Sequence, residues 1–144
     1  MRWEDFARAA PELAGFGRQR LEGRIAYLAT SRADGSPRVH PVSPILGGGY
    51  LLLFMYPTSP KGKDLQRDDR YALHCAVEDK EGGSGEFHVR GRARLVDAPE
   101  YWQAASPQGE TLRQKYILFE LGVDFAQSTV YTDDRPVHQR WSSA

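Results

Sequence analysis

The chain has 144 residues with 19 basic and 19 acidic side chains, so its formal net charge is zero. This length fits a single domain spanning residues 1–144, and a hydrophobic fraction of 40% is typical of a globular protein. Without net positive charge, no global field attracts nucleic acid or an anionic membrane, so any anion site must be local. Because Cys75 is the only cysteine and no apolar run is long enough to span a bilayer, we expect a cytoplasmic protein without a membrane or nucleic-acid partner.

The N-terminal segment, residues 1–22, is expected to be helical. Apolar side chains recur three or four positions apart, at Trp3, Phe6, Ala10 and Leu13. Proline is incompatible with a helix interior, so Pro11 is predicted to divide the segment into two short helices.

A strand pattern begins at Arg24. The segments Arg24–Ser31 and Pro37–Pro44 are rich in strand-forming residues, and the Asp34-Gly35 pair between them is typical of a tight hairpin turn. After three glycines, Tyr50–Tyr56 is apolar at nearly every position, which predicts a strand buried on both faces.

A short helix is predicted next. Ser59 is a favourable N-cap residue, and Pro60 would occupy the first helical position, where its missing N–H costs nothing. The helix is expected to run through Leu65, and another strand follows over Arg70–Val77.

The second half of the chain contains the clearest alternation of apolar and polar residues. After a glycine-rich loop over residues 79–85, the apolar side chains Phe87, Val89, Ala93 and Leu95 are predicted to share one face of a strand. The opposite face would carry His88, Arg90, Arg92 and Arg94. Helical segments are expected at 97–105 and 110–116, followed by closing strands at 117–123, 127–132 and 136–141.

The short connections between the first strands leave no room for parallel crossovers. The sheet is therefore predicted to be antiparallel, and closure into a barrel would remove its exposed edges. We expect a mainly β protein, built on a six-stranded antiparallel barrel with flanking helices.

The segment Ser59-Pro60-Lys61-Gly62-Lys63 indicates a phosphate site. A helix N-terminus offers unpaired N–H groups and the positive end of a dipole, and here a hydroxyl and two ammonium groups surround it. The alternative is an ordinary capped surface helix with two solvated lysines.

The strand Pro37-Arg38-Val39-His40-Pro41-Val42 is the second candidate. Arg38 lies among apolar neighbours and needs a partner, which a phosphate or an acidic side chain could provide. Pro41 cannot donate to a sheet ladder, so the strand must have an edge or a local break, where a flat ligand can lie against the backbone.

Taken in chain order, these features resemble the pyridoxamine 5′-phosphate oxidase-like family of FMN-binding split β-barrels. The resemblance covers about residues 20 to 96 and is carried by the Asp34-Gly35 turn, the Pro37–Val42 strand, the apolar strand Leu51–Tyr56, Ser59 with Lys61, and Asp68-Asp69-Arg70. It implies a homodimer in which each flavin site is built from both chains.

The resemblance also implies roles for individual residues. Arg38, Ser59 and Lys61 would hold the FMN phosphate, with Pro60 between them. The isoalloxazine ring would lie along the strand residues Val39, His40, Pro41 and Val42 and along Phe54 and Met55. Glu86, which stands where the family's best-known enzyme carries a glutamine, and the Gln139-Arg140-Trp141 stretch, above all Trp141, would reach the partner's flavin.

The expected function is an FMN-dependent oxidoreductase that transfers hydride between the flavin and a small organic substrate. Vitamin B6 oxidation is not expected, because the chain ends at Trp141-Ser-Ser-Ala without the Arg-x-His segment that binds that substrate. Three alternatives remain: a deazaflavin-dependent reductase, a non-enzymatic flavin or haem binder, and a domain that keeps only the fold. The acidic tail of a deazaflavin would need basic residues such as Arg90, Arg92 and Arg94, provided that they border the groove.

The remaining reactive residues give no second site. The histidines His40, His74, His88 and His138 lack the paired spacing of a zinc site, so no metal site is predicted, although a single histidine would suffice for haem. Cys75 is expected to be a buried, inert thiol. The arginine row of the alternating strand is expected to be a solvated or ion-paired face.

Overall fold

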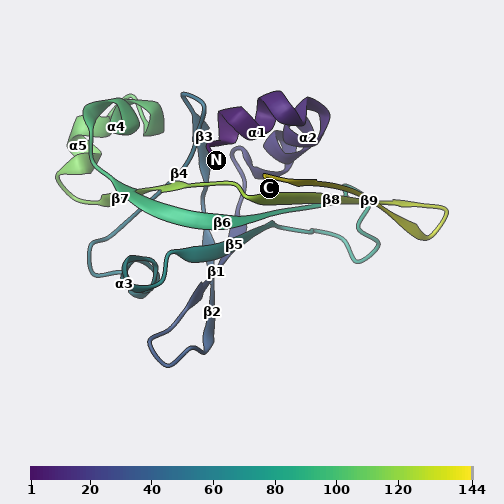
Figure 1. The fold of residues 1–144 in the computed structure, drawn as a ribbon, viewed down its shortest axis with the longest axis horizontal. Coiled ribbons are helices and arrows are strands. Elements are labelled where there is room, and N and C mark those ends of the chain that lie inside the picture. Colours follow the sequence, from purple (N-terminus) through teal and green to yellow (C-terminus); the bar gives the residue numbers. More distant parts are fainter. Residues whose placement is uncertain (144) are drawn as a thin grey trace.

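The computed structural model describes residues 1–143, and its main feature is one antiparallel sheet that curls into a half-barrel with helices at its flanks (Figure 1). This confirms the predicted fold class. The strands follow the order β2-β1-β5-β6-β7-β4-β3, with β8 paired to β6 and β9 paired to β8. Their bounds are β1 (Ala26–Ser31), β2 (Pro37–Val42), β3 (Ile45–Gly47), β4 (Tyr50–Met55), β5 (Arg70–Cys75), β6 (Glu86–Val96), β7 (Ile117–Leu121), β8 (Phe125–Thr132) and β9 (Arg135–Ser142).

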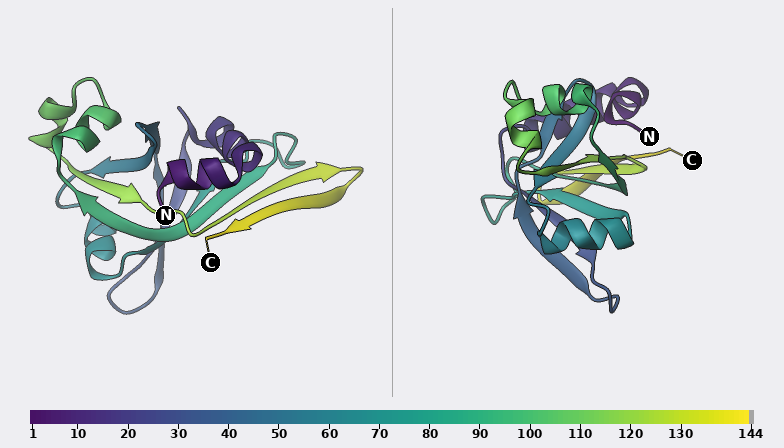
Figure 2. Two further views of the ribbon diagram at one scale, coloured as in Figure 1. Left: turned by 45° about the horizontal axis from the view of Figure 1, so that its top comes forward. Right: turned by 90° about the vertical axis from the view of Figure 1, so that its left-hand side faces the viewer.

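Residues 1–143 form nine strands, where a six-stranded barrel was expected. The last two segments, predicted as closing strands, form the β8–β9 hairpin, which extends the sheet beyond the curled part and projects from the body of the molecule (Figure 2). The three-residue strand β3 was missed. It pairs with β4 just before a turn at Gly48 and Gly49, which both have positive φ.

The helices fall into three groups. The helices α1 (Trp3–Ala9) and α2 (Pro11–Leu21) pack above the sheet, with Pro11 beginning the second of them as predicted. The helices α4 (Pro99–Ala105) and α5 (Gly109–Arg113) lie together at the other end, and α3 (Pro60–Arg67) lies below the sheet, against β1 and β6. No helix within residues 1–143 combines the length and the apolar character needed to cross a bilayer.

The long strand β6 explains how the sheet divides. Its first half pairs with both β5 and β8, whereas its last four residues pair with β7. The expected alternation is observed at Phe87, Val89 and Ala93, which are buried in the main core. The prediction was wrong at Leu95, which is 49% exposed, because the strand there enters a second core under α4 and buries Val96 instead.

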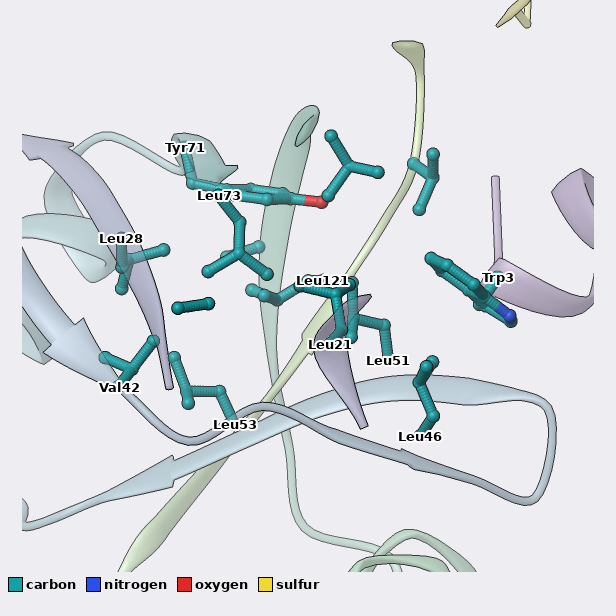
Figure 3. Close-up of a cluster of buried hydrophobic side chains, with 14 of the residues drawn as sticks. Trp3, Leu21, Leu28, Val42, Leu46, Leu51, Leu53, Tyr71, Leu73 and Leu121 are labelled. Carbon is teal, nitrogen blue, oxygen red and sulfur yellow. The ribbon is translucent and has the colours of Figure 1, made fainter. Parts of the chain in front are cut away.

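The main core fills the concave side of the sheet. Leucines from β1, β4, β5 and β7 meet the N-terminal helices there, and Tyr71 closes the cluster with its hydroxyl donating to the Gly122 carbonyl at 2.7 Å (Figure 3). Burial of these side chains stabilises the curvature that brings β2, β4 and α3 together.

Candidate functional site

A cavity of about 610 Å³ opens between β2, the end of β4 and the start of α3. It gathers eight of the residues predicted for the cofactor site: His40, Pro41, Val42, Phe54, Met55, Ser59, Pro60 and Lys61. These residues come from β2, β4 and the start of α3, and β2 and β4 lie near opposite ends of the strand order and do not pair with each other within residues 1–143. The volume falls within the range of small-molecule and cofactor sites.

The start of α3 forms one end of the cavity. Pro60 occupies the first helical position, as predicted, and the Lys63 N–H donates to the Ser59 carbonyl at 3.1 Å. Ser59 is the N-cap residue, but its hydroxyl does not cap the helix; it accepts a hydrogen bond from the Lys61 ammonium at 3.1 Å. A β-carbon at Gly62 would lie 2.9 Å from the Met55 sulfur, so this glycine permits the helix to approach β4 closely.

Lys61 has an unusual electrostatic position. Its side chain is half-buried, and among residues 1–143 no carboxylate lies within ion-pair distance of it. Burial lowers the pKa of this ammonium, because desolvation disfavours its charged form. A half-desolvated cation beside a helix N-terminus is stabilised when an anion binds, so this end of the cavity has the chemistry of a phosphate site.

Arg38 lies on the same side of the barrel as α3, but not in this cavity. Its Nε donates to the buried Asp64 carboxylate at 2.7 Å, and Asp64 also accepts from Thr30 and Arg67. Burial opposes ionisation of Asp64, yet these hydrogen bonds outweigh it and lower the pKa of the carboxyl. Of the two partners that the sequence allowed for Arg38, a phosphate or an acidic side chain, the structure shows an acidic side chain. The terminal amino groups of Arg38 make no hydrogen bond within residues 1–143.

The other predicted residues lie elsewhere in the single chain. Val39 is 66% exposed and is not among the residues that line the cavity. Glu86 accepts a hydrogen bond from the Tyr131 hydroxyl at 2.7 Å. The Trp141 ring packs against Phe6 with 5.0 Å between ring centroids. The structure thus places Glu86 and Trp141 outside the cavity formed by their own chain.

The cavity has an aromatic wall, of which Tyr116 was not foreseen. Tyr116 lines the cavity and stands 4.9 Å from both Phe54 and Tyr56, ring centroid to centroid, and its hydrogen bond with the Tyr56 hydroxyl raises its pKa. Sequence reasoning placed Tyr116 in a helix, whereas α5 ends at Arg113. Only the long-range pairing of Met55 with Ile117 brings Tyr116 to β4, and no local pattern signals that pairing.

Two of the three arginines in the row on β6 are neutralised by ion pairs within the fold. Arg92 pairs with Asp69 and Arg94 with Glu120, each at 2.6 Å, and Arg90 lies 4.1 Å above the centre of the Phe125 ring. This matches the expected ion-paired face. Cys75 is buried, as expected. Within residues 1–143, no group of three or more His, Cys, Asp and Glu side chains is arranged to hold a metal ion.

The curled antiparallel sheet and its flanking helices define a split β-barrel. Residues 18–135 match the sequence profile of the pyridoxamine 5′-phosphate oxidase family, so the chain belongs to that family. No curated protein gives a significant match.

Solved structures share the fold at low sequence identity. PhzG from Burkholderia lata, in complex with tetrahydrophenazine-1-carboxylic acid, has a TM-score of 0.70 at 14% identity, covering 99% of this chain and 88% of that one. A haem-binding protein from Mycobacterium smegmatis has a TM-score of 0.64 at 20% identity, over 81% of this chain and 52% of that one. This chain therefore spans about half of that protein's length. The haem storage protein HutZ from Vibrio cholerae gives 0.58 at 17% identity, over 99% and 95%. These likenesses show the fold alone.

Proposed function

We propose that this protein binds FMN and transfers hydride between the flavin and a small organic substrate. The observation that carries the proposal is the half-buried Lys61, which has no acidic partner within residues 1–143 and lies beside the Ser59 hydroxyl at the end of a cavity of about 610 Å³. A terminal phosphate there would supply the missing negative charge.

The rest of the cavity suits a flat ring. The strand β2 forms an edge of the sheet, and Pro41 has no N–H to offer a neighbouring strand. The ring would lie along His40, Pro41 and Val42, with the aromatic wall of Phe54 and Tyr116 on another side. When bound, the flavin supplies the hydride chemistry, and these side chains would hold and orient it. No acid–base pair is required from the chain.

Arg38 would act at the edge of the phosphate site. Asp64 fixes its Nε, so the remaining guanidinium N–H groups would be held in a defined direction. Such preorganisation lowers the entropic cost of binding an anion.

We propose a homodimer as the working form. Val39 and Tyr27 are 66% and 45% exposed, and both lie on adjacent strands β2 and β1 on the face opposite the core. A second copy covering this face would bury them and would bring Glu86 or Trp141 of one chain towards the cavity of the other.

The binding test is a titration of the purified protein with FMN, followed by quenching of flavin fluorescence. We expect saturable, stoichiometric binding that the Lys61→Ala substitution weakens by about tenfold, as expected for one charge-assisted contact. Lys80→Ala, an exposed lysine on the far loop, serves as the matched control. If the Lys61→Ala and Lys80→Ala variants bound FMN with equal affinity, Lys61 would not bind the phosphate and the proposed site would be wrong.

Activity is tested separately. Reduction of the bound FMN by a nicotinamide nucleotide, followed by transfer to an added acceptor, supports an oxidoreductase. A bound flavin that neither accepts nor passes on electrons supports a storage or sensing role instead.

One observation favours haem as a second candidate. The Nδ1 of His40 lies 2.7 Å from the Pro41 carbonyl, which can only accept, so in a neutral ring Nδ1 would carry the proton and Nε2 would keep its lone pair. A histidine in this state on the cavity wall could bind the iron of a haem through Nε2. The visible spectrum distinguishes the candidates: a Soret band that His40→Ala abolishes indicates haem, and a flavin spectrum indicates FMN.

A further inference from the structure

A second cavity, of about 370 Å³, lies where β6 pairs with β7, beside the N-terminal segment. Its charged lining side chains are Arg2, Asp69, Arg92, Arg94 and Glu120. Among the described residues, it shares none with the cavity proposed for the flavin. A ligand of this cavity would therefore bind independently of the flavin.

The most buried of these side chains is Glu120, which is only 5% exposed. The antiparallel pairing of β6 with β7 places it directly opposite Arg94, whose Nη2 donates to Oε1 of Glu120 at 2.6 Å. The second oxygen, Oε2, is buried and accepts no hydrogen bond within residues 1–143. Because an unpaired buried acceptor costs free energy, a hydrogen-bond donor at Oε2 would stabilise this cluster.

Arg2 approaches this oxygen without bonding to it. Its Nε is 3.5 Å from Oε2 of Glu120, within ion-pair distance, but the two atoms form no hydrogen bond. Aromatic side chains hold the guanidinium instead: its Nη2 donates to the Tyr101 hydroxyl at 3.1 Å, and its central carbon lies 5.1 Å from the centre of the Tyr50 ring. Because its side chain is 43% exposed, Arg2 is accessible from solvent.

The charges of this cluster do not balance. Within residues 1–143, Glu120 is the only carboxylate within ion-pair distance of Arg2 and Arg94. The other charged groups that border the cavity are already in ion pairs, Asp69 with Arg92 and the Met1 amino group with Asp124. The excess positive charge falls on Arg2, since Arg94 makes the shorter contact with Glu120. A ligand with one negative charge would neutralise it.

These two features restrict the chemistry of the ligand. Oε2 of Glu120 needs a hydrogen-bond donor, and Arg2 needs an anion such as a carboxylate. A simple carboxylate has no donor at neutral pH, and an α-amino acid has an ammonium group that leaves the excess positive charge in place. An α-hydroxy acid combines a donor with a single negative charge. The volume of the cavity is at the lower end of the range for small-molecule sites.

We infer that this cavity binds a small α-hydroxy acid, whose carboxylate pairs with Arg2 and whose hydroxyl donates to Oε2 of Glu120. Tyr101 contributes by preorganisation, because its hydroxyl accepts from both Arg2 and Arg94 and so holds the two guanidinium groups in place. The site does not depend on whether the protein binds FMN.

The test uses three probes of similar size on the full chain: lactate, 2-methoxypropionate and propionate. Lactate has the hydroxyl donor, 2-methoxypropionate has in its place an ether oxygen that can only accept, and propionate has neither. Binding is followed through the NMR signals of the Ala93 and Gly122 amides, which belong to residues that line the cavity. Sodium chloride keeps the ionic strength constant, so that screening is equal in all titrations.

We expect saturable shifts with lactate, at an affinity at least about tenfold higher than that of either other probe, because the lost hydrogen bond is to a charged acceptor. L-Alanine, which has an ammonium donor but no net charge, should bind more weakly than lactate.

Two variants assign the roles of the residues. Arg2→Ala removes the unbalanced charge and should weaken lactate binding at least about fivefold. Arg8→Ala, on α1 but outside the cavity lining, is the control and should change it less than about twofold. Glu120→Gln replaces the accepting Oε2 by an amide group that donates, so the preference for lactate over 2-methoxypropionate should disappear. Thermal unfolding checks that each variant is folded, and the probe series on the unmodified chain decides the matter where one is not.

Three results would overturn the inference. If lactate and propionate bind with equal affinity, no donor is recognised and Glu120 is not part of a ligand site. If alanine binds more tightly than lactate, the assignment to a hydroxy acid is wrong. If lactate causes no saturable shift at Ala93 or Gly122, the cavity does not bind this class of ligand. None of these results bears on FMN binding, which fluorescence quenching measures separately.

Discussion

Two basic regions of this protein look equivalent in the sequence and differ in the structure. On β6, Arg94 donates to Glu120 at 2.6 Å, and Glu120 is almost fully buried beneath it. At the start of α3, Lys61 is itself half-buried, and the only hydrogen-bond partner of its ammonium within residues 1–143 is the Ser59 hydroxyl. The charge of Arg94 is balanced by a carboxylate of the protein itself. The charge of Lys61 is not, so it is available to a bound anion.

The difference teaches how to choose among basic residues when looking for an anion site. An arginine that is already paired with a buried carboxylate attracts an anionic ligand only weakly. A desolvated cation without a counter-charge is stabilised when an anion binds beside it. Arg38 is intermediate, because its Nε donates to Asp64 while its terminal amino groups make no hydrogen bond in the part of the chain that the structure describes. Substitutions can test whether Arg94, Lys61 and Arg38 differ in this way.

The largest expected effect is on Asp64, which joins the site to the fold. Asp64→Asn removes the charge that holds Arg38 and Arg67 while leaving a side chain of the same size in a buried position. Breaking a buried ion pair is costly, and we expect the free energy of unfolding to fall by about 3 kcal/mol. Denaturant titration measures this loss. The exposed pair of Asp97 with Arg113 at 2.8 Å is the control, and Asp97→Asn should cost less than about 1 kcal/mol.

The same carboxylate predicts a pH dependence. The pKa of Asp64 in the folded state is lower than its ordinary value of 3.8. Its stabilising contribution is therefore fully present above that value and is lost as the pH falls through the folded pKa. We expect the Asp64→Asn variant to lose less stability than the unmodified chain on acidification below 3.8. Parallel acid-unfolding curves for the two proteins would contradict this assignment.

A slightly smaller effect is expected on binding. Removing both candidate phosphate ligands in Arg38→Ala with Lys61→Ala should lower FMN affinity at least ~100-fold, since each charge-assisted contact contributes roughly 1.5–3 kcal/mol. The matched control is Arg8→Ala with Lys80→Ala, which changes the net charge equally. An unchanged dissociation constant in the double variant would show that neither residue contacts the phosphate.

The sequence predicted much of this region because its signals are local. The Asp34-Gly35 turn forms, with Gly35 at positive φ, and Pro60 begins α3. Strand and helix periodicity then place β2, β4 and α3 in the right order. Local patterns could not show that Arg38 would form an ion pair with Asp64, because that contact depends on how α3 packs against β1 and β2.

The features that sequence reasoning missed depend on long-range pairing. Tyr116 reaches the cavity only because β7 pairs with β4, and Leu95 is exposed only because β6 passes from one core to another. No window of neighbouring residues contains that information.

The neutralised arginine provides the complementary test. Arg94→Ala leaves Glu120 buried with only the Arg2 Nε at 3.5 Å, so we expect the free energy of unfolding to fall by about 1–2 kcal/mol. FMN affinity should not change, because Arg94 does not line the flavin cavity. Denaturant titration and fluorescence quenching on the same variant measure the two quantities. A loss of FMN affinity without loss of stability would reverse the roles assigned to Arg94 and Lys61.

The smallest effect concerns two neighbouring histidines on the outer face of the sheet. His74 and His88 stack with 5.9 Å between ring centroids, yet their pKa values are expected to move in opposite directions. Hydrogen bonding to Cys75 raises the pKa of His74 against the effect of burial, whereas burial, the neighbouring His74 and Arg90 lower that of His88. His74 therefore stabilises the fold below its ordinary value of 6.5 and loses that contribution as the pH rises, and His88 loses its contribution as the pH falls.

Because these two contributions oppose each other, the net stability should change little near neutral pH, and the measurement must resolve the single residues. In an NMR titration, His74 is expected to titrate above 6.5 and His88 below it. In His74→Gln, the pKa of His88 should rise towards its ordinary value, since a nearby positive charge has been removed. If His88 titrated at the same pH with and without His74, the stacked pair would not be electrostatically coupled. The lowered pKa of His88 would then not depend on the charge of His74, and burial would be its main cause.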